Sequence, residues 1–228
     1  MNGAGRTFEP WVSDAVRAHM EELLAAAAAG TPERYRASMR SLGMDLGERL
    51  RGSLPGEGDI LVVTTVEDAD FLGRGIVDAL GVGDRLKVFC YWNERDAVRD
   101  VAPIISKYEE PLDEPRVSAV VVVKSIISGA CVVRTNLIEA LDKLHHSVPV
   151  FVVAPVMHVD ARKKLRREFP TEVADRFKYV VCAFDTEKEG EVIRPGIGGS
   201  VYELLGLGDK HTKNRLRPRM LSERRRVG

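Results

Sequence analysis

The sequence predicts an α/β domain in which a mostly parallel sheet is covered by helices on both faces. Short, nearly continuous apolar runs recur along the chain, helical segments separate most of them, and no internal repeat or clear linker divides it. Strands that are buried on both faces have continuous rather than alternating apolar runs. The length of 228 residues suits one such domain with an appendage.

Residues 10–52 are expected to be helical. Leu23, Leu24 and the alanines that follow them end at Gly30, and glycine is a usual helix stop. Thr31-Pro32-Glu33 predicts the start of a second helix, with a capping threonine, a proline in the first turn and an early acid. This helix is expected to run to about Leu50.

Strand and helix patterns alternate after this segment. The expected strands are 60–63, 86–91, 118–123, 148–153 and 179–183, and the expected helices are 71–80, 136–144 and 161–168. Residues 93–116 interrupt the rhythm because they are charged, contain three prolines and are longer than a normal connection. Two interpretations stay open for them: a surface excursion, or an arm that reaches across a site or to a second subunit.

Charge and cysteine usage limit the classes of partner. Lys plus Arg and Asp plus Glu both number 34, so no net charge attracts nucleic acid or an anionic membrane. No apolar run approaches the roughly 20 residues of a membrane span, and no signal pattern opens the chain, so we expect a cytoplasmic protein. Cys90, Cys131 and Cys182 lack metal spacing and are expected to be buried free thiols.

The last stretch, residues 210–226, is strongly basic. We expect a solvated, partly disordered tail, and the alternative is a contact patch for a partner or for phosphate groups. Nucleic acid is not expected as a partner, except through this tail.

Candidate site residues follow the ends of the predicted strands, because ligands of open parallel sheets bind beyond the carboxyl ends of the strands. Catalytic candidates are Lys124, His158 and Asp185. Candidate ligand-binding residues are Glu67, Asp68, Asp70, Ser125, Ser128, Gly129, Arg194, Gly196, Ile197, Gly198 and Gly199. Structural roles stay open for these residues. Lys124 could pair with an acid or reach solvent, His158 could cap a helix or lie at the surface, and Asp185 could belong to a polar turn. Glu67, Asp68 and Asp70 could stand at the start of a solvated helix.

Four stretches, in order, resemble the uracil phosphoribosyltransferase family over residues 33–209. They are RYRASMRSLGMDLGERLRGSLP, YWNERDAVRDVAPIISKYEEPL, FVVAPVMHVDARKKLRREFP and VVCAFDTEKEGEVIRPGIGGSVYELLGLGD. The resemblance implies a phosphoribosyltransferase-like sheet with a small hood and a β-arm, assembled as a dimer or larger oligomer. It sets residues 1–32 apart as a helical extension and residues 210–228 as a basic tail.

The departures from the family fall on its phosphate loops. Lys124 stands where the family has an acid, and Gly129-Ala130-Cys131 stands where it has Thr-Gly-Gly. The family's diphosphate-binding arginine aligns with about Glu67, and an acid there would repel a diphosphate. The resemblance implies that the base rests against a loop at residues 194–200, and two family acids of this region align with Gly199 and Tyr202. The exchanged charges either neutralise each other across the pocket or suit a ligand with a reversed charge layout.

Three functions follow from this pattern. The first is a divergent homologue that binds or acts on a base- or nucleotide-like small molecule. In it Lys124 stabilises charge or acts as a nucleophile whose pKa is lowered by burial, and His158 and Asp185 act as acid–base groups. The second is a non-catalytic regulatory or interaction homologue. The third is a genuine uracil phosphoribosyltransferase that makes UMP from uracil and phosphoribosyl diphosphate. No resident metal is expected, and Mg²⁺ would enter only with a phosphorylated substrate.

Overall fold

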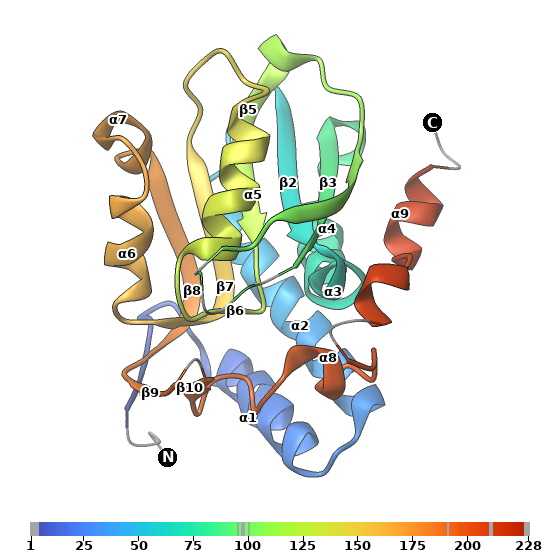
Figure 1. Ribbon diagram of the computed structural model, residues 1–228, viewed down its shortest axis with the longest axis vertical. Coiled ribbons are helices and arrows are strands. Elements are labelled where there is room, and N and C mark those ends of the chain that lie inside the picture. The colour runs from blue at the N-terminus through green and yellow to red at the C-terminus, as the bar shows by residue number, and fades with distance from the viewer. Residues whose placement is uncertain are drawn as a thin grey trace.

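A computed structural model describes residues 5–94, 96, 99, 101–190, 192–209 and 212–225. Parts of three predictions lie outside these described residues: the first four residues of the extension, part of the 93–116 stretch, and both ends of the basic tail. The predicted fold class is confirmed, because a mostly parallel sheet carries helices on both faces (Figure 1). No helix among the described residues could span a membrane.

The strands and helices alternate over most of the chain. The strands are β1 (Arg6–Phe8), β2 (Asp59–Thr65), β3 (Leu86–Asn93), β4 (Ile104–Glu109), β5 (Val117–Val123), β6 (Ile126–Ile127), β7 (Val150–His158), β8 (Phe177–Asp185), β9 (Glu187–Glu189) and β10 (Val192–Arg194). The helices are α1 (Asp14–Ala28), α2 (Pro32–Arg51), α3 (Val66–Asp68), α4 (Arg74–Leu80), α5 (Cys131–Leu141), α6 (Ala161–Arg167), α7 (Thr171–Ala174), α8 (Val201–Leu204) and α9 (Arg219–Arg224). A π-helical turn, Ala69–Gly73, joins α3 to α4.

The main sheet has the strand order β1-β8-β7-β5-β2-β3-β4. Its central strands β8, β7, β5, β2 and β3 are parallel, and the two edge strands β1 and β4 are antiparallel to their neighbours. The short strand β6 pairs with β7 beyond the end of β5. Because the parallel strands all end at one edge, the segments that follow β2, β3 and β5 are brought together there.

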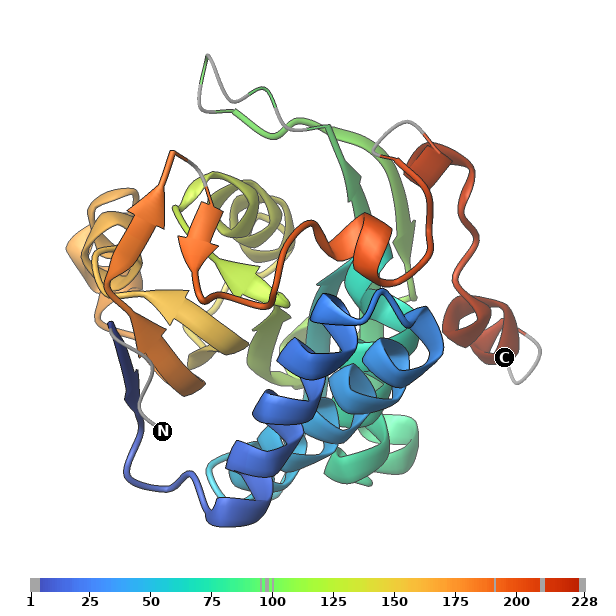
Figure 2. The same cartoon turned by 90° about the horizontal axis from the view of Figure 1, so that it is seen from below.

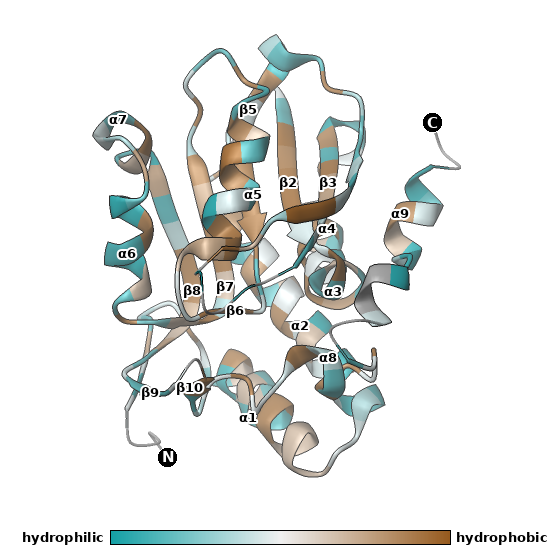
Figure 3. Ribbon diagram, viewed as in Figure 1, coloured by the Kyte–Doolittle hydropathy of each residue, from teal (hydrophilic) through white to brown (hydrophobic). Residues whose placement is uncertain are grey.

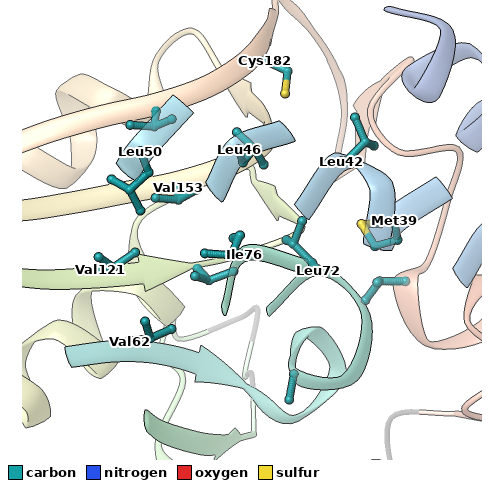
Figure 4. Close-up of a cluster of buried hydrophobic side chains, with 14 of the residues drawn as sticks. Met39, Leu42, Leu46, Leu50, Val62, Leu72, Ile76, Val121, Val153 and Cys182 are labelled. Carbon is teal, nitrogen blue, oxygen red and sulfur yellow. The ribbon is translucent and has the colours of Figure 1, made fainter. Parts of the chain in front are cut away.

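Alternate residues of each central strand face the two helical layers. Val62 of β2 packs in one core cluster with Leu42 and Leu46 of α2 (Figure 4). Val63, the next residue, packs in the other cluster with Leu137 of α5. This separation is the two-residue period of a strand, so the continuous apolar runs correspond to strands buried on both faces.

The N-terminal segment is helical as predicted, and α1 packs beside α2 (Figure 2). Gly30, at a φ of +62°, follows the end of α1, a backbone conformation that glycine adopts without strain. The second helix begins at Pro32, as expected, but Thr31 does not cap it with its side chain. The Thr31 hydroxyl instead donates to the carbonyl of Ala26. The strand β1 was not predicted, because three residues are too few for a period to show.

The described part of residues 93–116 contains β4, which pairs with β3 and extends the sheet. The prediction of a solvated tail is wrong for the helix α9 of the C-terminal segment. There α9 packs against the body beside β4, with Met220 and Leu221 buried. The Arg224 guanidinium donates to both carboxylate oxygens of Glu110, at 2.6 and 2.9 Å.

Candidate functional site

A cavity of about 240 Å³ lies at the carboxyl edge of the sheet. Its walls come from the residues after β2, the end of β3, the segment after β5, the start of α5, and α8. The lining residues are Glu67, Asn93, Glu94, Lys124, Ile126, Ile127, Ser128, Gly129, Cys131, Val132, Val133, Val201 and Tyr202. Five chain segments therefore meet where the sheet topology places a ligand site.

Lys124 forms a buried ion pair with two acids of the β2 end. Its Nζ lies 2.7 Å from Asp68 Oδ2 and 3.1 Å from Glu67 Oε1. The three side chains are between 1% and 11% exposed. Asp68 Oδ2 also accepts a hydrogen bond from the Thr65 hydroxyl at 2.8 Å. The exchanged charges therefore neutralise each other, which is the first of the two arrangements that the sequence left open.

The ion pair fixes the protonation state of Lys124. Burial lowers the pKa of its ammonium group, but the charges of Asp68 and Glu67 outweigh burial and raise this pKa above its ordinary value. The amine therefore stays protonated at neutral pH. The prediction of a nucleophilic Lys124 with a lowered pKa is wrong, and a fixed positive charge remains as its role.

Tyr202 of α8 also contacts this cluster. Burial raises the pKa of its hydroxyl, and the Glu67 carboxylate, to which the hydroxyl donates a hydrogen bond, raises it further. Lys124 and Tyr202 thus approach Glu67 from β5 and α8. The sequence marked Tyr202 only as a departure from the family, although its alignment with a family acid was the signal that it belongs to the site.

Two further polar lining residues were missed by the sequence reasoning. Asn93 ends β3, two residues beyond the predicted end of that strand, and Glu94 follows it. The Asn93 side chain donates to Asn136 Oδ1 at 2.8 Å and to the carbonyl of Ala102 at 3.1 Å. The rule that located the other candidates would have found both residues if the strand had been extended into the charged stretch.

The segment after β5 forms another part of the cavity wall. Ser128 and Gly129 line it as predicted, and a Cβ added at Gly129 would meet nothing within 4 Å. Ser125 is not a lining residue, although it is fully buried and its hydroxyl has no hydrogen-bond partner among the described residues. The helix α5 begins here without a side-chain cap, so its first backbone N–H groups favour negative charge.

His158 does not line the cavity. Its Nδ1 accepts from the backbone N–H of Asp160 at 3.2 Å, so its Nε2 carries the proton and donates to the carbonyl of Thr186 at 3.3 Å. This tautomer is assigned from the partners. Both ring nitrogens are therefore occupied within the chain, and the geometry does not support the predicted acid–base role.

Asp185 does not line the cavity either, and it is fully buried. Both of its oxygens bind the Arg6 guanidinium at 2.7 Å, and Oδ2 accepts from the backbone N–H of Gly196 at 2.9 Å. Arg6 in turn donates to the carbonyl of Gly196 at 2.6 Å. This network ties β1 to the glycine-rich loop, so Asp185 has a structural role in place of the predicted acid–base role.

The glycine-rich loop packs on the N-terminal segment and does not line the cavity. The carbonyl of Ile197, a buried residue, accepts from the Tyr35 hydroxyl at 3.0 Å. A Cβ at Gly198, whose φ is +90°, would collide with the side chain of Ala27 in α1. The close approach of α1 therefore explains why position 198 is occupied by a glycine. The loop's contribution to the site is indirect, because it leads into α8.

The remaining predicted ligand-binding residues bind the chain itself or face solvent. Arg194 is exposed and pairs with Glu189 at 3.1 Å, and Gly199 is exposed. Asp70 accepts from the backbone N–H groups of Arg219 and Met220, at 2.9 and 2.8 Å, so it caps the start of α9. The cavity thus keeps Lys124, Glu67, Ser128 and Gly129 of the predicted set, with Asp68 directly behind them.

The acids after β2 do not fit a resident metal ion. Among the described residues no group of three or more His, Cys, Asp or Glu side chains could hold one. Glu67 and Asp68 are both directed to the ammonium group of Lys124. Asp70 binds α9. We therefore derive no step through Mg²⁺.

Neither a protein-family model nor a curated protein sequence matches the chain. Among solved structures, the AQ2163 protein from Aquifex aeolicus aligns with 84% of this chain and 94% of its own, at a TM-score of 0.67 and 16% identity. This similarity shows a shared fold. A hypoxanthine phosphoribosyltransferase from Staphylococcus aureus aligns with 54% of this chain and 65% of its own, at a TM-score of 0.41 and 10% identity. The hypoxanthine phosphoribosyltransferase from Trypanosoma cruzi, in complex with IMP, aligns with 65% of this chain and 73% of its own, at a TM-score of 0.41 and 13% identity.

Proposed function

We propose that the protein binds a base- or nucleotide-like small molecule in the cavity at the carboxyl ends of β2 and β5. We further propose that it does not use phosphoribosyl diphosphate in the standard way. One observation carries the proposal: the ammonium group of Lys124 is already bound by Glu67 and Asp68 in the wall of the cavity. The uracil phosphoribosyltransferase resemblance supplies the class of ligand.

The charges of the lining oppose a diphosphate. The described lining contains two carboxylates, those of Glu67 and Glu94, and one cation, Lys124, which is paired. A diphosphate is held in proteins by several cations or by a metal ion, and carboxylates at the same place repel it. A standard transferase of the resembled family would need a positively biased cavity below Ser128, and these residues do not provide one.

The volume and polarity of the cavity favour a small, largely neutral ligand. Its walls are mostly apolar, with a few polar groups at defined places, which is the usual composition of a small-molecule site. Its volume is below the roughly 300–1,000 Å³ of sites for drug-sized ligands, so a base or nucleoside is the appropriate size. The start of α5 favours one anionic group on such a ligand, for example a single phosphate.

A non-catalytic role is the second candidate function. The observation that favours it is that His158 and Asp185 bind partners within the chain and do not line the cavity. If the protein does act on its ligand, Lys124 contributes electrostatic stabilisation and Glu67 accepts hydrogen bonds. A homodimer and a cytoplasmic location are part of the proposal through the sequence expectations alone.

A blocking variant tests the site without disturbing the fold. Gly129→Leu places a side chain in open space within the cavity. Gly56→Leu is the matched control, because Gly56 is exposed, also has nothing within 4 Å of an added Cβ, and precedes β2, whereas the cavity lies beyond the carboxyl end of that strand. The assay is thermal unfolding with a panel of nucleobases, nucleosides and nucleoside monophosphates.

We expect at least one member of the panel to raise the melting temperature by about 5–10 °C at about 100 times its Kd. Gly129→Leu should abolish this rise, and Gly56→Leu should keep it. A panel without any stabilising member would contradict the proposal. So would a rise that Gly129→Leu leaves intact.

A further inference from the structure

A second cavity of about 570 Å³ lies along α6 and α7 and shares no lining residue with the first. Both helices stand at the far side of the sheet from α8 and α9, and α6 is largely hydrophilic (Figures 1 and 3). The lining residues are Val159, Arg162, Lys163, Arg166, Arg167, Phe169, Thr171 and Ala174. We call this cavity the α6 groove.

The α6 groove is basic because of how α6 packs on the sheet. Ala161 and Leu165, four residues apart, are fully buried and fix the helix on the core. The remaining helix face carries two pairs of cations with the same spacing. Four of the eight lining residues are therefore cations, and none is an acid.

Among the described residues, three of these four cations have no carboxylate partner. Arg166 is bound by Asp175 at 2.6 Å. Arg162 stacks over the ring of Tyr179 at 4.7 Å, which orients its guanidinium without neutralising it. Lys163 and Arg167 form no ion pair with any residue in the described part of the chain. Like charges one helical turn apart repel each other, so an anion bound here would relieve the repulsion.

We propose that the α6 groove binds a multiply charged phosphate ester of nucleotide size, namely a nucleoside polyphosphate. Guanidinium and ammonium groups on one face match a chain of phosphates in charge and in hydrogen-bond donors. Val159, Phe169 and Ala174 offer an apolar surface for the base. The volume is within the roughly 300–1,000 Å³ of small-molecule sites. The ligand would occupy a site separate from the first cavity, as an effector does.

Calorimetry on the full chain tests the inference with ATP, inorganic triphosphate and adenosine as probes. We expect ATP and triphosphate to bind, adenosine to bind at least about tenfold more weakly than ATP, and binding of the anions to weaken as salt is raised. Lys163→Gln and Arg167→Gln should each weaken ATP binding about tenfold. Lys164→Gln is the matched control, because Lys164 is exposed on the same helix but does not line the groove.

Gly129→Leu separates this site from the first cavity, and it should leave ATP binding unchanged. The inference is overturned if ATP does not bind, if the two groove variants bind it as well as the control does, or if Gly129→Leu abolishes binding. A single-stranded oligonucleotide that binds through Lys163 and Arg167 while ATP does not would also overturn it, in favour of a nucleic-acid surface. Because the substituted side chains are exposed, the variants are expected to fold, and unfolding curves verify this.

Discussion

Replacement of Lys124 by methionine should destabilise the protein strongly. The substitution leaves the carboxylates of Glu67 and Asp68 only 7% and 1% exposed and without their shared cation. Removing one partner of a buried ion pair typically costs about 3–5 kcal/mol, because the remaining charge is neither solvated nor neutralised. For a chain of this size that loss corresponds to a melting temperature lower by about 10 °C.

The assay is urea and thermal unfolding at neutral pH, with Lys107→Met as the control. Lys107 also contacts a carboxylate at 2.7 Å, that of Glu139, but these side chains are 48% and 32% exposed. An exposed pair of this kind contributes at most about 1 kcal/mol. Addition of Asp68→Asn to Lys124→Met should recover part of the loss, since a buried amide costs less than an unpaired charge. A Lys124→Met variant within about 1 kcal/mol of the wild type would refute the reasoning.

Three further predictions concern other parts of the fold. Arg6→Met leaves the buried Asp185 unpaired, so the free energy of unfolding measured in urea should fall by about 3–5 kcal/mol. A loss below about 1 kcal/mol would contradict the structural role of this pair. Asp70→Ala removes the acceptor for two N–H groups of α9 and should lower the free energy of unfolding by about 1 kcal/mol. Proteases should also cleave the C-terminal segment earlier, and unchanged cleavage would show that α9 does not depend on this cap. The pKa of His146 is raised by a hydrogen bond to a backbone carbonyl and by Glu114, so its contribution is complete below the ordinary histidine pKa of about 6.5 and is lost as pH rises. The wild type should therefore exceed His146→Gln in stability by more at about pH 5.5 than at about pH 8, and an equal difference at both would refute the assignment.

The sequence predicted the sheet well because its physical signal is strong. A strand buried on both faces needs an unbroken apolar run, and each of the five predicted runs is a parallel strand. The same topology brought Lys124 and Glu67 together across 57 positions of the chain, since both follow strands that end at one edge. The strand-end rule thus located the centre of the candidate site.

The strand-end rule failed for His158 and Asp185 because it identifies the edge of the sheet at which a residue lies but not the direction in which its side chain points. Both residues end strands at the correct edge, but their side chains bind neighbouring loops. The partner of Asp185, Arg6, is 179 positions away and belongs to a three-residue strand, so no local pattern marks it. A pairing of this kind depends on the completed fold.

The C-terminal helix was missed because its composition is dominated by charge. Only two apolar residues of α9, Met220 and Leu221, are buried, which is too few to produce a visible period. The segment is nevertheless held by Asp70 and Glu110, acids that lie far from it in the sequence. Arg224, one of the basic residues of this segment, therefore has its partner within the chain.

Calorimetry of phosphoribosyl diphosphate with Mg²⁺ tests most directly the claim that a buried charge pair has replaced a diphosphate site. With Lys124 bound by Glu67 and Asp68, we expect no binding tighter than about 1 mM by the wild type. The same protein should bind a base, nucleoside or nucleoside monophosphate in a manner that Gly129→Leu abolishes. Micromolar binding of phosphoribosyl diphosphate that Gly129→Leu abolishes would contradict the account and would favour a genuine uracil phosphoribosyltransferase.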